Sequence, residues 1–403
     1  MTEVESQRLK EQVRGAIDGM RRRLIEMAAT VHANPEIGYQ EYQTAQLYTD
    51  ALETAGFTLH RGVAGLPTAF KATYRGRDDG PTVAFLAELD ALPGVGHACG
   101  HNIIGTASVG AAMALRPLMP TISGTVVVFG TPAEEAAVDD AGGKVRMLAA
   151  IKEANAAMLV HPSSVNTVSA RNVCREALLI EFHGKAAHAG AAPHLGVNAL
   201  DAAVNTFNLI NALRQHVTSD VRIHGIISHG GDSPNVVPAY AALKLYVRAP
   251  RRETLEAVVD RVTNCARGAA LGTGASVEVK SYAARYLNMV SNPTLARLFR
   301  QNWEWLGLTI EEPSERSYGS TDMGNVSQEL PALHPYVAIA PAGTPGHSDA
   351  FREAARSKKA QEGLIFAVKG LAMTAIDLFT RPDQVHQMQR DFDAFKRGDF
   401  TDF

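Results

Sequence analysis

The 403-residue chain has few cysteines, no excess of charge and no long apolar run, and each absence excludes a class of protein. Its 39 basic and 42 acidic residues give a formal net charge of -3, so no binding to nucleic acid or to an anionic membrane surface is expected. No apolar run approaches the roughly 18 residues needed to span a bilayer. The charged start of the chain lacks a basic segment followed by an apolar one, so no signal peptide is expected.

The three cysteines, Cys99, Cys174 and Cys265, are too few and too scattered for a disulfide framework. We therefore expect a cytoplasmic protein with reduced thiols. Hydrophobic residues make up 46% of the chain, which is ample for a large buried core. The length favours two domains or more.

The first part of the chain has the pattern of an α/β protein. Amphipathic helices are predicted over about 13–30 and 42–55. Three short runs follow that are apolar on both faces, as buried parallel strands are: "TVAFLAELD", "GTVVVFGTP" and "AAMLVHP". Helix-like segments lie between these runs, and this alternation is typical of an open α/β sheet.

From about Val173 the pattern changes to strand, helix, strand, helix and strand over about 110 residues, the size of a small independent domain. After Tyr286 the earlier pattern resumes. We therefore predict a mostly parallel-sheet α/β catalytic domain formed by residues 1–172 and 286–403. A smaller α+β domain at 173–285 is inserted into it.

Polar side chains follow each of the three predicted strands. Glu88 and Asp90 end the first strand, Glu134 and Glu135 follow the second, and His161 ends the third. In open α/β sheets, ligands bind beyond the carboxyl ends of the strands. We therefore expect these side chains to meet at one edge of the sheet.

A glycine-rich turn after the first strand adds Cys99 and His101. Thiolate, imidazole and carboxylate are the donors that zinc prefers, and manganese or cobalt can share such a set. The donors exceed what one tetrahedral ion uses, so two ions about 3.5–4 Å apart, bridged by an acid, are expected. Two other interpretations of Cys99 stay open: a small core residue, or a thiol nucleophile with His101 as its base.

The adjacent carboxylates Glu134 and Glu135 would repel each other unless their roles differ. One can bind a metal while the other takes a proton from a metal-activated water, a division that suits amide hydrolysis. Further along the chain, Asp322, His334 and His347 are candidates for the same site. His347 lies in the glycine-rich "PAGTPGHSD", and loops commonly carry site residues.

The predicted inserted domain has its own polar candidates for substrate contact or for stabilising an oxyanion: His188, His194, His224 and Asn235. His183 and His216, by contrast, are expected to lie on solvated faces.

Eight motifs occur in the order of a known family: "VHANPEIGYQEYQTA", "AELDALP", "GHACGHN", "GTPAEE", "HP", "GKAAHAGAAPHLGVNALDA", "GGDSPNVVP" and "GSTDMGN…GHSDAF". The chain resembles the dinuclear-metal aminoacylase and carboxypeptidase family, which includes succinyl-diaminopimelate desuccinylase and the auxin-conjugate amidohydrolases. Nearly the whole chain is covered. The motifs are most similar to a subgroup with the aminobenzoyl-glutamate hydrolase B-type subunits and the β-alanyl-lysine dipeptidase.

The resemblance implies a ligand set for two divalent ions, zinc first and manganese or cobalt as alternatives: Cys99, His101, Glu135, His161 and His347. Glu134 matches the general base. The implied fold is an α/β catalytic domain with an inserted ferredoxin-like lid, and the implied assembly is a homodimer through that lid.

The resemblance also implies roles for residues of the lid. His188 matches a histidine that, in dimeric relatives, reaches the partner subunit's site and helps to hold the oxyanion. Asn235 and Arg248 match positions that contact the substrate's carboxylate or carbonyl, and His224 is a further substrate-binding candidate.

Two positions depart from better-known branches. Asn102 stands where the auxin-conjugate branch usually has an aspartate, which would lower the negative charge near the metals. Glu88 stands where most metallopeptidase relatives have a histidine.

The leading hypothesis is a metal-dependent hydrolase of an amide bond in an N-acyl amino acid or a dipeptide, with Glu134 as general base. Two alternatives remain. One is a thiol hydrolase that uses Cys99 and His101, and the other is a metal-stabilised binding protein or a subunit that needs a partner.

Overall fold

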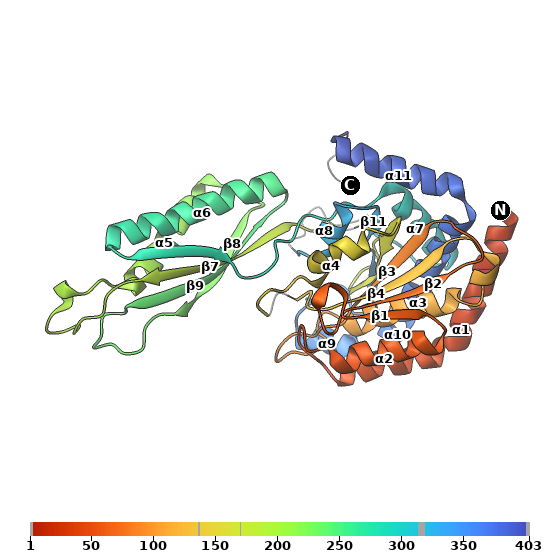
Figure 1. Cartoon of the computed structure of the whole chain (residues 1–403), viewed down its shortest axis with the longest axis horizontal. Coiled ribbons are helices and arrows are strands. Elements are labelled where there is room, and N and C mark those ends of the chain that lie inside the picture. Colours follow the sequence, from red (N-terminus) through yellow and green to blue (C-terminus); the bar gives the residue numbers. More distant parts are fainter. Residues whose placement is uncertain (1–2, 136–137, 170, 313–318, 400–403) are drawn as a thin grey trace. The chain divides into compact units, whose positions relative to one another are not determined.

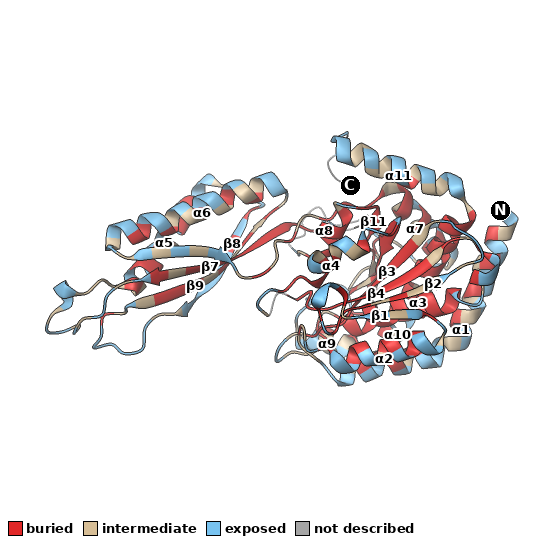
Figure 2. Ribbon diagram, viewed as in Figure 1, coloured by how far each residue is buried: buried red, intermediate tan, exposed pale blue. Residues whose placement is uncertain are grey.

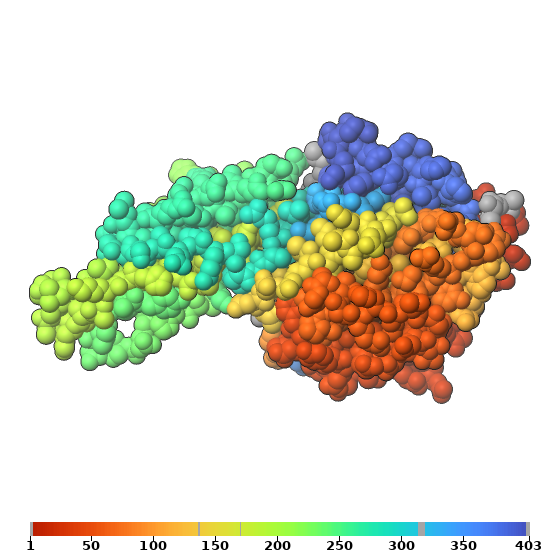
Figure 3. Space-filling model, in the orientation of Figure 1, coloured from red at the N-terminus to blue at the C-terminus, as the bar shows by residue number. Residues whose placement is uncertain are grey.

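The computed structural model describes residues 3–135, 138–169, 171–312 and 319–399. The chain forms two compact units (Figure 1). The larger unit comprises Met1–Arg171, Met289–Ser317 and Asp322–Phe403, and the smaller one comprises Asn172–Asn288 and Tyr318–Thr321. Segments from both ends of the chain, red to orange and blue in Figure 3, therefore belong to the larger unit.

The larger unit contains a six-stranded sheet in the order β1-β2-β4-β3-β5-β11. Its strands are β1 (Thr58–Arg61), β2 (Phe70–Arg75), β3 (Thr82–Glu88), β4 (Thr125–Thr131), β5 (Ala156–Met158) and β11 (Ala332–Leu333). Strands β4, β3, β5 and β11 run parallel, which confirms the predicted α/β class. Strands β1 and β2 add an antiparallel edge that the sequence did not indicate.

Helices lie on both faces of this sheet. The helices of the larger unit are α1 (Glu3–Ala33), α2 (Tyr42–Thr54), α3 (His101–Leu115), α4 (Gly143–Ile151), α7 (Pro293–Trp305), α8 (Met323–Ser327), α9 (Asp349–Ala354), α10 (Lys358–Thr380) and α11 (Pro382–Arg397). Alternate residues of β3 face opposite ways: Val83 and Phe85 join the core with α1, α3 and α10, while Ala84 and Leu86 join the core with α4 and α8. A separate parallel pair is formed by β6 (His161–Ser163) and β12 (Tyr336–Ala338).

Helix α3 is buried along its whole length (Figure 2). Its small residues let it lie directly on the sheet. A Cβ on Gly105 would come within 2.6 Å of the Tyr48 ring and 2.8 Å of the Glu88 carbonyl oxygen. This close approach places the start of α3, with His101, beside the end of β3.

Helix α10 is long and apolar enough to cross a membrane by length and composition, contrary to the expectation that no segment would qualify. However, 89% of its apolar stretch is buried inside the protein. Gly370 packs without room for a side chain, since a Cβ there would lie 2.5 Å from the Phe299 ring. Such packing is that of a core helix in a globular domain.

The smaller unit has the order strand, helix, strand, strand, helix, strand. Its elements are β7 (Cys174–His183), α5 (Ala199–Leu213), β8 (Arg222–His229), β9 (Tyr240–Ala249), α6 (Arg252–Thr273) and β10 (Ser276–Ser281). The antiparallel sheet has the order β10-β7-β9-β8, with α5 and α6 on one face (Figure 1). This is the ferredoxin-like arrangement that the family resemblance implied. Strand β8 was missed from the sequence.

Candidate metal centre

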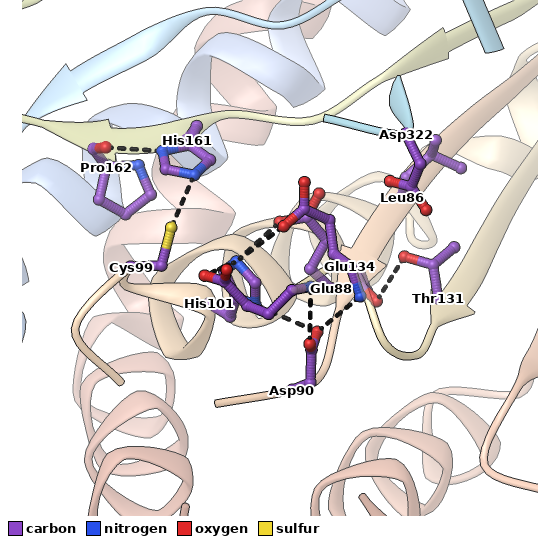
Figure 4. A network of polar contacts seen from close by, with 12 residues as sticks. Leu86, Glu88, Asp90, Cys99, His101, Thr131, Glu134, His161, Pro162 and Asp322 are labelled. Carbon is purple, nitrogen blue, oxygen red and sulfur yellow. Dashed lines mark hydrogen bonds and ion pairs between the residues drawn. The ribbon is translucent and has the colours of Figure 1, made fainter. Parts of the chain in front are cut away.

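The carboxyl ends of β3 and β4 meet at one edge of the larger sheet. These strands pair in parallel register up to Glu88 opposite Thr131, so the chain segments that follow them leave the sheet side by side. His161 begins β6, just beyond the end of β5. The structure therefore brings the predicted donors of the larger unit together, as Figure 4 shows for Cys99, His101 and His161.

Two groups of three metal-ligating side chains share one sulfur atom. Cys99, His101 and His161 form one group, and Cys99, Glu135 and His347 form the other, with the ligand atoms of each group within 4.8 Å of one another. The Cys99 sulfur lies 3.3 Å from His161 Nε2, and His347 Nε2 lies 3.4 Å from Glu135 Oε1. The Cys99 sulfur is the atom that both groups have in common. An acid that bridges two ions stays a prediction from the sequence.

Hydrogen bonds with main-chain groups orient two of the histidines, His161 and His347. His161 Nδ1 lies 2.7 Å from the Pro162 carbonyl oxygen, so Nδ1 carries the hydrogen and donates it, and the lone pair of Nε2 points toward Cys99 and can bind a metal. His347 adopts a left-handed φ of 58°, and its amide N–H donates to Ala98 O at 3.0 Å. Contact with the backbone next to Cys99 holds His347 beside the other ligands.

His101 lies between two carboxylates. Asp90 Oδ1 is 3.3 Å from its Nδ1, and Glu88 Oε2 is 3.3 Å from its Nε2. A carboxylate behind a ligating imidazole fixes the ring's orientation and tautomer. Asp90 therefore orients His101, while Nε2 faces the other donors.

The residues present fit divalent ions. His101 Nε2 and Glu135 Oε1 are buried without a hydrogen-bond partner among the described residues. Burial and the nearby Glu135 raise the pKa of the Cys99 thiol. A bound cation stabilises the thiolate and supplies the missing partners, so metal binding satisfies a site that is otherwise electrostatically unfavourable.

Glu134 lies beside the two ligand groups. Its Oε2 is 3.9 Å from His101 Nε2, and the residue is buried. Burial, Glu88 and Glu135 raise the pKa of Glu134 well above its usual value. A carboxyl group with a raised pKa is better suited to accept and return a proton than an ordinary one.

A buried lysine that the sequence did not indicate lies behind this site. Lys144 Nζ lies 2.8 Å from Glu88 Oε1 and 2.5 Å from Asp322 Oδ1. Burial raises the pKa of Glu88, but Lys144 and His101 outweigh it and lower that pKa to about 2. Glu88, His101 and Glu134 also have metal-ligating spacing, yet the Glu88 carboxylate already has a cationic partner.

His334 and Asn102 lie near the ligands, but their side chains pack in the protein interior. His334 is fully buried, and its ring centroid lies 5.4 Å from that of His161. Burial lowers the pKa of His334 to about 3, so it packs as a neutral ring. Asn102 donates from Nδ2 to the carbonyls of Ala28 and Ala355, at 3.3 and 3.2 Å.

In the smaller unit, two candidates lie together on adjacent loops. Exposed His188 accepts at Nδ1 from the N–H groups of Gly190 and Ala191 at 3.2 and 3.0 Å, and it bridges to Val236. Asn235 accepts a hydrogen bond from Ser233.

The other two candidates of the smaller unit lie on neighbouring strands. Arg248 Nε is 3.4 Å from His224 Nε2, and Arg248 Nη1 donates to Ser320 Oγ at 2.9 Å. His183 and His216 are exposed, as expected, and His194 is also exposed on a short loop helix.

Known proteins resemble both the smaller unit and the chain as a whole. Residues 177–273 match a family model described as the peptidase dimerisation domain of the M20 group. The chain is 37% identical to the Xaa-Arg dipeptidase of Mus musculus, over 96% of this chain and 93% of that protein. It is 28% identical to a p-aminobenzoyl-glutamate hydrolase subunit of Escherichia coli (strain K12), over 93% of each chain.

A solved structure has the same fold. The crystal structure of a Bacillus subtilis protein, described as a dinuclear metal binding peptidase from the M20 family, matches with a TM-score of 0.67. The match covers 90% of this chain and 99% of that one at 24% sequence identity.

Proposed function

Because this chain belongs to the M20 peptidase family, we propose that its larger unit holds two divalent ions, zinc first, and hydrolyses dipeptides that end in arginine. The general class is that of its relatives: a metal-dependent hydrolase of an amide bond in a dipeptide or an N-acyl amino acid. The observation that carries the proposal is the pair of three-ligand groups that share the Cys99 sulfur, with Glu134 beside them.

The ligand assignment follows the two groups. Cys99, His101 and His161 would hold one ion, and Cys99, Glu135 and His347 the other. Bound divalent ions would lower the pKa of water and polarise the scissile carbonyl. Asp90 keeps the His101 ring in place, and Lys144 keeps Glu88 ionised behind it.

Glu134 moves the protons. Its carboxylate removes a proton from the attacking water as the new C–O bond forms. It then delivers that proton to the leaving nitrogen as the C–N bond breaks. From the family resemblance, we assign His188 to stabilising the oxyanion and Asn235, Arg248 and His224 to contacting the substrate.

The substrate proposal rests on the relatives' names. The 37% identical mouse relative is a Xaa-Arg dipeptidase, whereas the 28% identical bacterial relative is named for p-aminobenzoyl-glutamate. Both substrates have an amide bond whose nitrogen belongs to an amino acid with a free α-carboxylate. Alanyl-arginine is therefore the first substrate to assay, with p-aminobenzoyl-glutamate as the comparison.

The Glu134→Gln variant tests the mechanism. Gln keeps the size of the side chain but cannot take a proton, so kcat for alanyl-arginine should fall by about 10²–10⁴-fold. Bound zinc, measured by mass spectrometry, should stay at the wild-type level. Glu362→Gln, an exposed site on α10, is the matched control and should keep wild-type kcat. Near-normal turnover by the Glu134 variant would refute the mechanism.

We also propose that the protein is a homodimer formed through the smaller unit. Strand β8 lies at the edge of its sheet, and it exposes 62% of Ile226 and 41% of Ile227. An exposed apolar edge strand is a ready template for pairing with a second chain. The match to a peptidase dimerisation domain supports this assembly. A cytoplasmic location stays a prediction from the scattered cysteines.

A second candidate function is that of a subunit active only with a partner, because the bacterial relative is itself named as one subunit of a hydrolase. The purified chain alone, loaded with zinc, distinguishes the two. Turnover of either substrate without any added protein would exclude the partner requirement.

A further inference from the structure

The segment "PEIGYQE", residues 35–41, lies along the loop that carries Glu134 and Glu135. At Gly38 there is no room for a side chain, because a Cβ there would lie 2.8 Å from the Ala133 Cβ. The Tyr39 hydroxyl donates to the Asp140 carbonyl oxygen at 2.5 Å. This segment belongs to a motif of the sequence for which the proposed chemistry gives no role.

Three consecutive amide N–H groups of that loop donate to buried carboxylates. Ala133 N–H donates to Glu41 Oε1 at 2.9 Å. The Glu134 N–H donates to Asp90 Oδ1 at 3.1 Å (Figure 4), and the Glu135 N–H donates to Asp90 Oδ2 at 2.9 Å. Hydrogen bonds to buried carboxyl groups thus hold the loop at three successive points.

Ala133 needs such an anchor. It adopts a φ of 52°, the left-handed region that residues with a Cβ rarely occupy. Non-glycine residues persist in this region only where the surrounding structure holds them. Because Ala133 directly precedes Glu134, its conformation sets the direction in which Glu134 and Glu135 leave the strand.

Glu41 is itself rigidly held. It is fully buried, and Thr68 Oγ1 donates to its second oxygen at 2.7 Å. It directly precedes helix α2, whose Gln43 and Thr44 N–H groups donate to Glu36 at 3.0 and 2.9 Å. The position of Glu41 is therefore fixed, and a movement of the loop would break its hydrogen bond to Ala133.

The two anchors are also joined to each other. Ala91, the residue after Asp90, donates its N–H to the Glu36 carbonyl oxygen at 2.7 Å. Asp90 additionally lies 3.3 Å from His101, so changing it would disturb a metal ligand as well. Glu41 hydrogen-bonds to Ala133 and Thr68, and it can be changed without removing a contact to a ligand side chain.

We propose that Glu41 is a positioning residue that holds Ala133 in its left-handed conformation and thereby aims Glu134 at the reacting water. The inference rests on the proposed role of Glu134 as general base. This role gives the opening motif of the sequence a function. Glu36 binds the first N–H groups of α2 and fixes the start of that helix, and Glu41, just before the helix, binds Ala133 and fixes the loop relative to it.

Three variants test this inference, each loaded with zinc and assayed on alanyl-arginine. Glu41→Met removes both acceptors at similar length, and it should lower kcat by about 10- to 100-fold with unchanged KM and bound zinc, since a small misplacement suffices. Glu41→Gln keeps an oxygen for the Ala133 N–H and should restore most of the loss. Leu52→Ala weakens the core side of the same helix and should lower the melting temperature but not kcat.

Hydrogen exchange of the metal-free proteins gives a readout that does not depend on activity. Amides 133–135 should exchange faster in Glu41→Met than in wild type, and not in Glu41→Gln or Leu52→Ala. If Glu41→Met does not fold, Thr68→Val, which removes the other anchor of Glu41, should shift kcat and exchange in the same direction. Wild-type kcat or wild-type exchange in the folded variant overturns the proposal.

The outcome is separable from that of the proposed function. If Glu134→Gln keeps its activity, the base assignment fails while the exchange result still reports on the anchor. If Glu134→Gln is inactive and Glu41→Met is fully active, only the positioning role fails.

Discussion

Asn102 follows the ligand His101 in sequence, yet its side chain binds the main chain of two other segments. Its amide donates to the carbonyls of Ala28 in α1 and of Ala355 after α9, and it is 1% exposed. An aspartate cannot donate to these oxygens. The departure from the better-known branch is therefore explained by helix packing, and no charge effect at the metals is needed.

Replacing Asn102 by Asp should destabilise the fold. A buried carboxylate would face two carbonyl oxygens, so the free energy of unfolding should fall by about 1–3 kcal/mol. Urea denaturation followed by circular dichroism measures this. Asn34→Asp is the control, because Asn34 donates to the Thr30 carbonyl at an exposed site. Equal stability of the two variants would contradict the packing role.

Glu41 should also make stability depend on pH. Burial and the negative Asp90 raise its pKa from 4.5 to about 7. The folded state then binds the proton more tightly, so this contribution is fully present below pH 4.5 and is lost as the pH rises through about 7. The loss is on the order of 3 kcal/mol for the metal-free protein.

Denaturation of metal-free wild type and Glu41→Gln at pH 5 and pH 8 checks this. A glutamine at position 41 cannot titrate, so the variant should gain stability relative to wild type as the pH rises. A difference that stays constant with pH would show that Glu41 does not titrate in this range.

The sequence was sufficient to predict the clustering of the ligands, because parallel strands bring their carboxyl ends to one edge whatever the loops do. It could not predict Lys144, whose partners Glu88 and Asp322 come from distant parts of the chain. Nor could it predict the left-handed Ala133, because alanine has no local preference for that conformation.

At the scale of elements, strand β8 has a sequence pattern that does not indicate a strand. Its residues are mostly exposed, and Gly225 interrupts the run, so it lacks the alternation of a half-buried strand. Gly225 is needed there, because a Cβ would lie 2.2 Å from the Lys244 carbonyl oxygen of β9. The buried strands β3 and β4 were predicted because their apolar runs are continuous.

If β8 pairs with a second chain, a charge on it should prevent dimerisation. Ile226→Lys places an ammonium group on the exposed edge, where burial against a partner would require its desolvation. Sedimentation velocity should show a dimer for wild type and a monomer for the variant. Val4→Lys, at an 81% exposed site in the larger unit, should remain dimeric. A dimeric Ile226 variant would place the interface elsewhere.

At the scale of the whole molecule, one catalytic unit is assembled from segments on both sides of an insertion. The larger unit supplies all five proposed metal ligands and the base, and His347 joins them from beyond the insertion. The smaller unit also includes a short segment around Gly319, which lies far beyond the insertion in the sequence and whose carbonyl oxygen accepts from Val173 N–H at 2.9 Å. The sequence does not indicate that this segment joins the smaller unit, since the contact is a hydrogen bond between main-chain groups.

The central claim is that divalent ions at the Cys99 site are required for amide hydrolysis. The most direct test is to remove bound metal by exhaustive chelation and then titrate zinc back while measuring alanyl-arginine hydrolysis. We predict loss of activity on chelation and recovery that saturates at two zinc ions per chain. Full activity after chelation would contradict the claim and favour a thiol mechanism at Cys99.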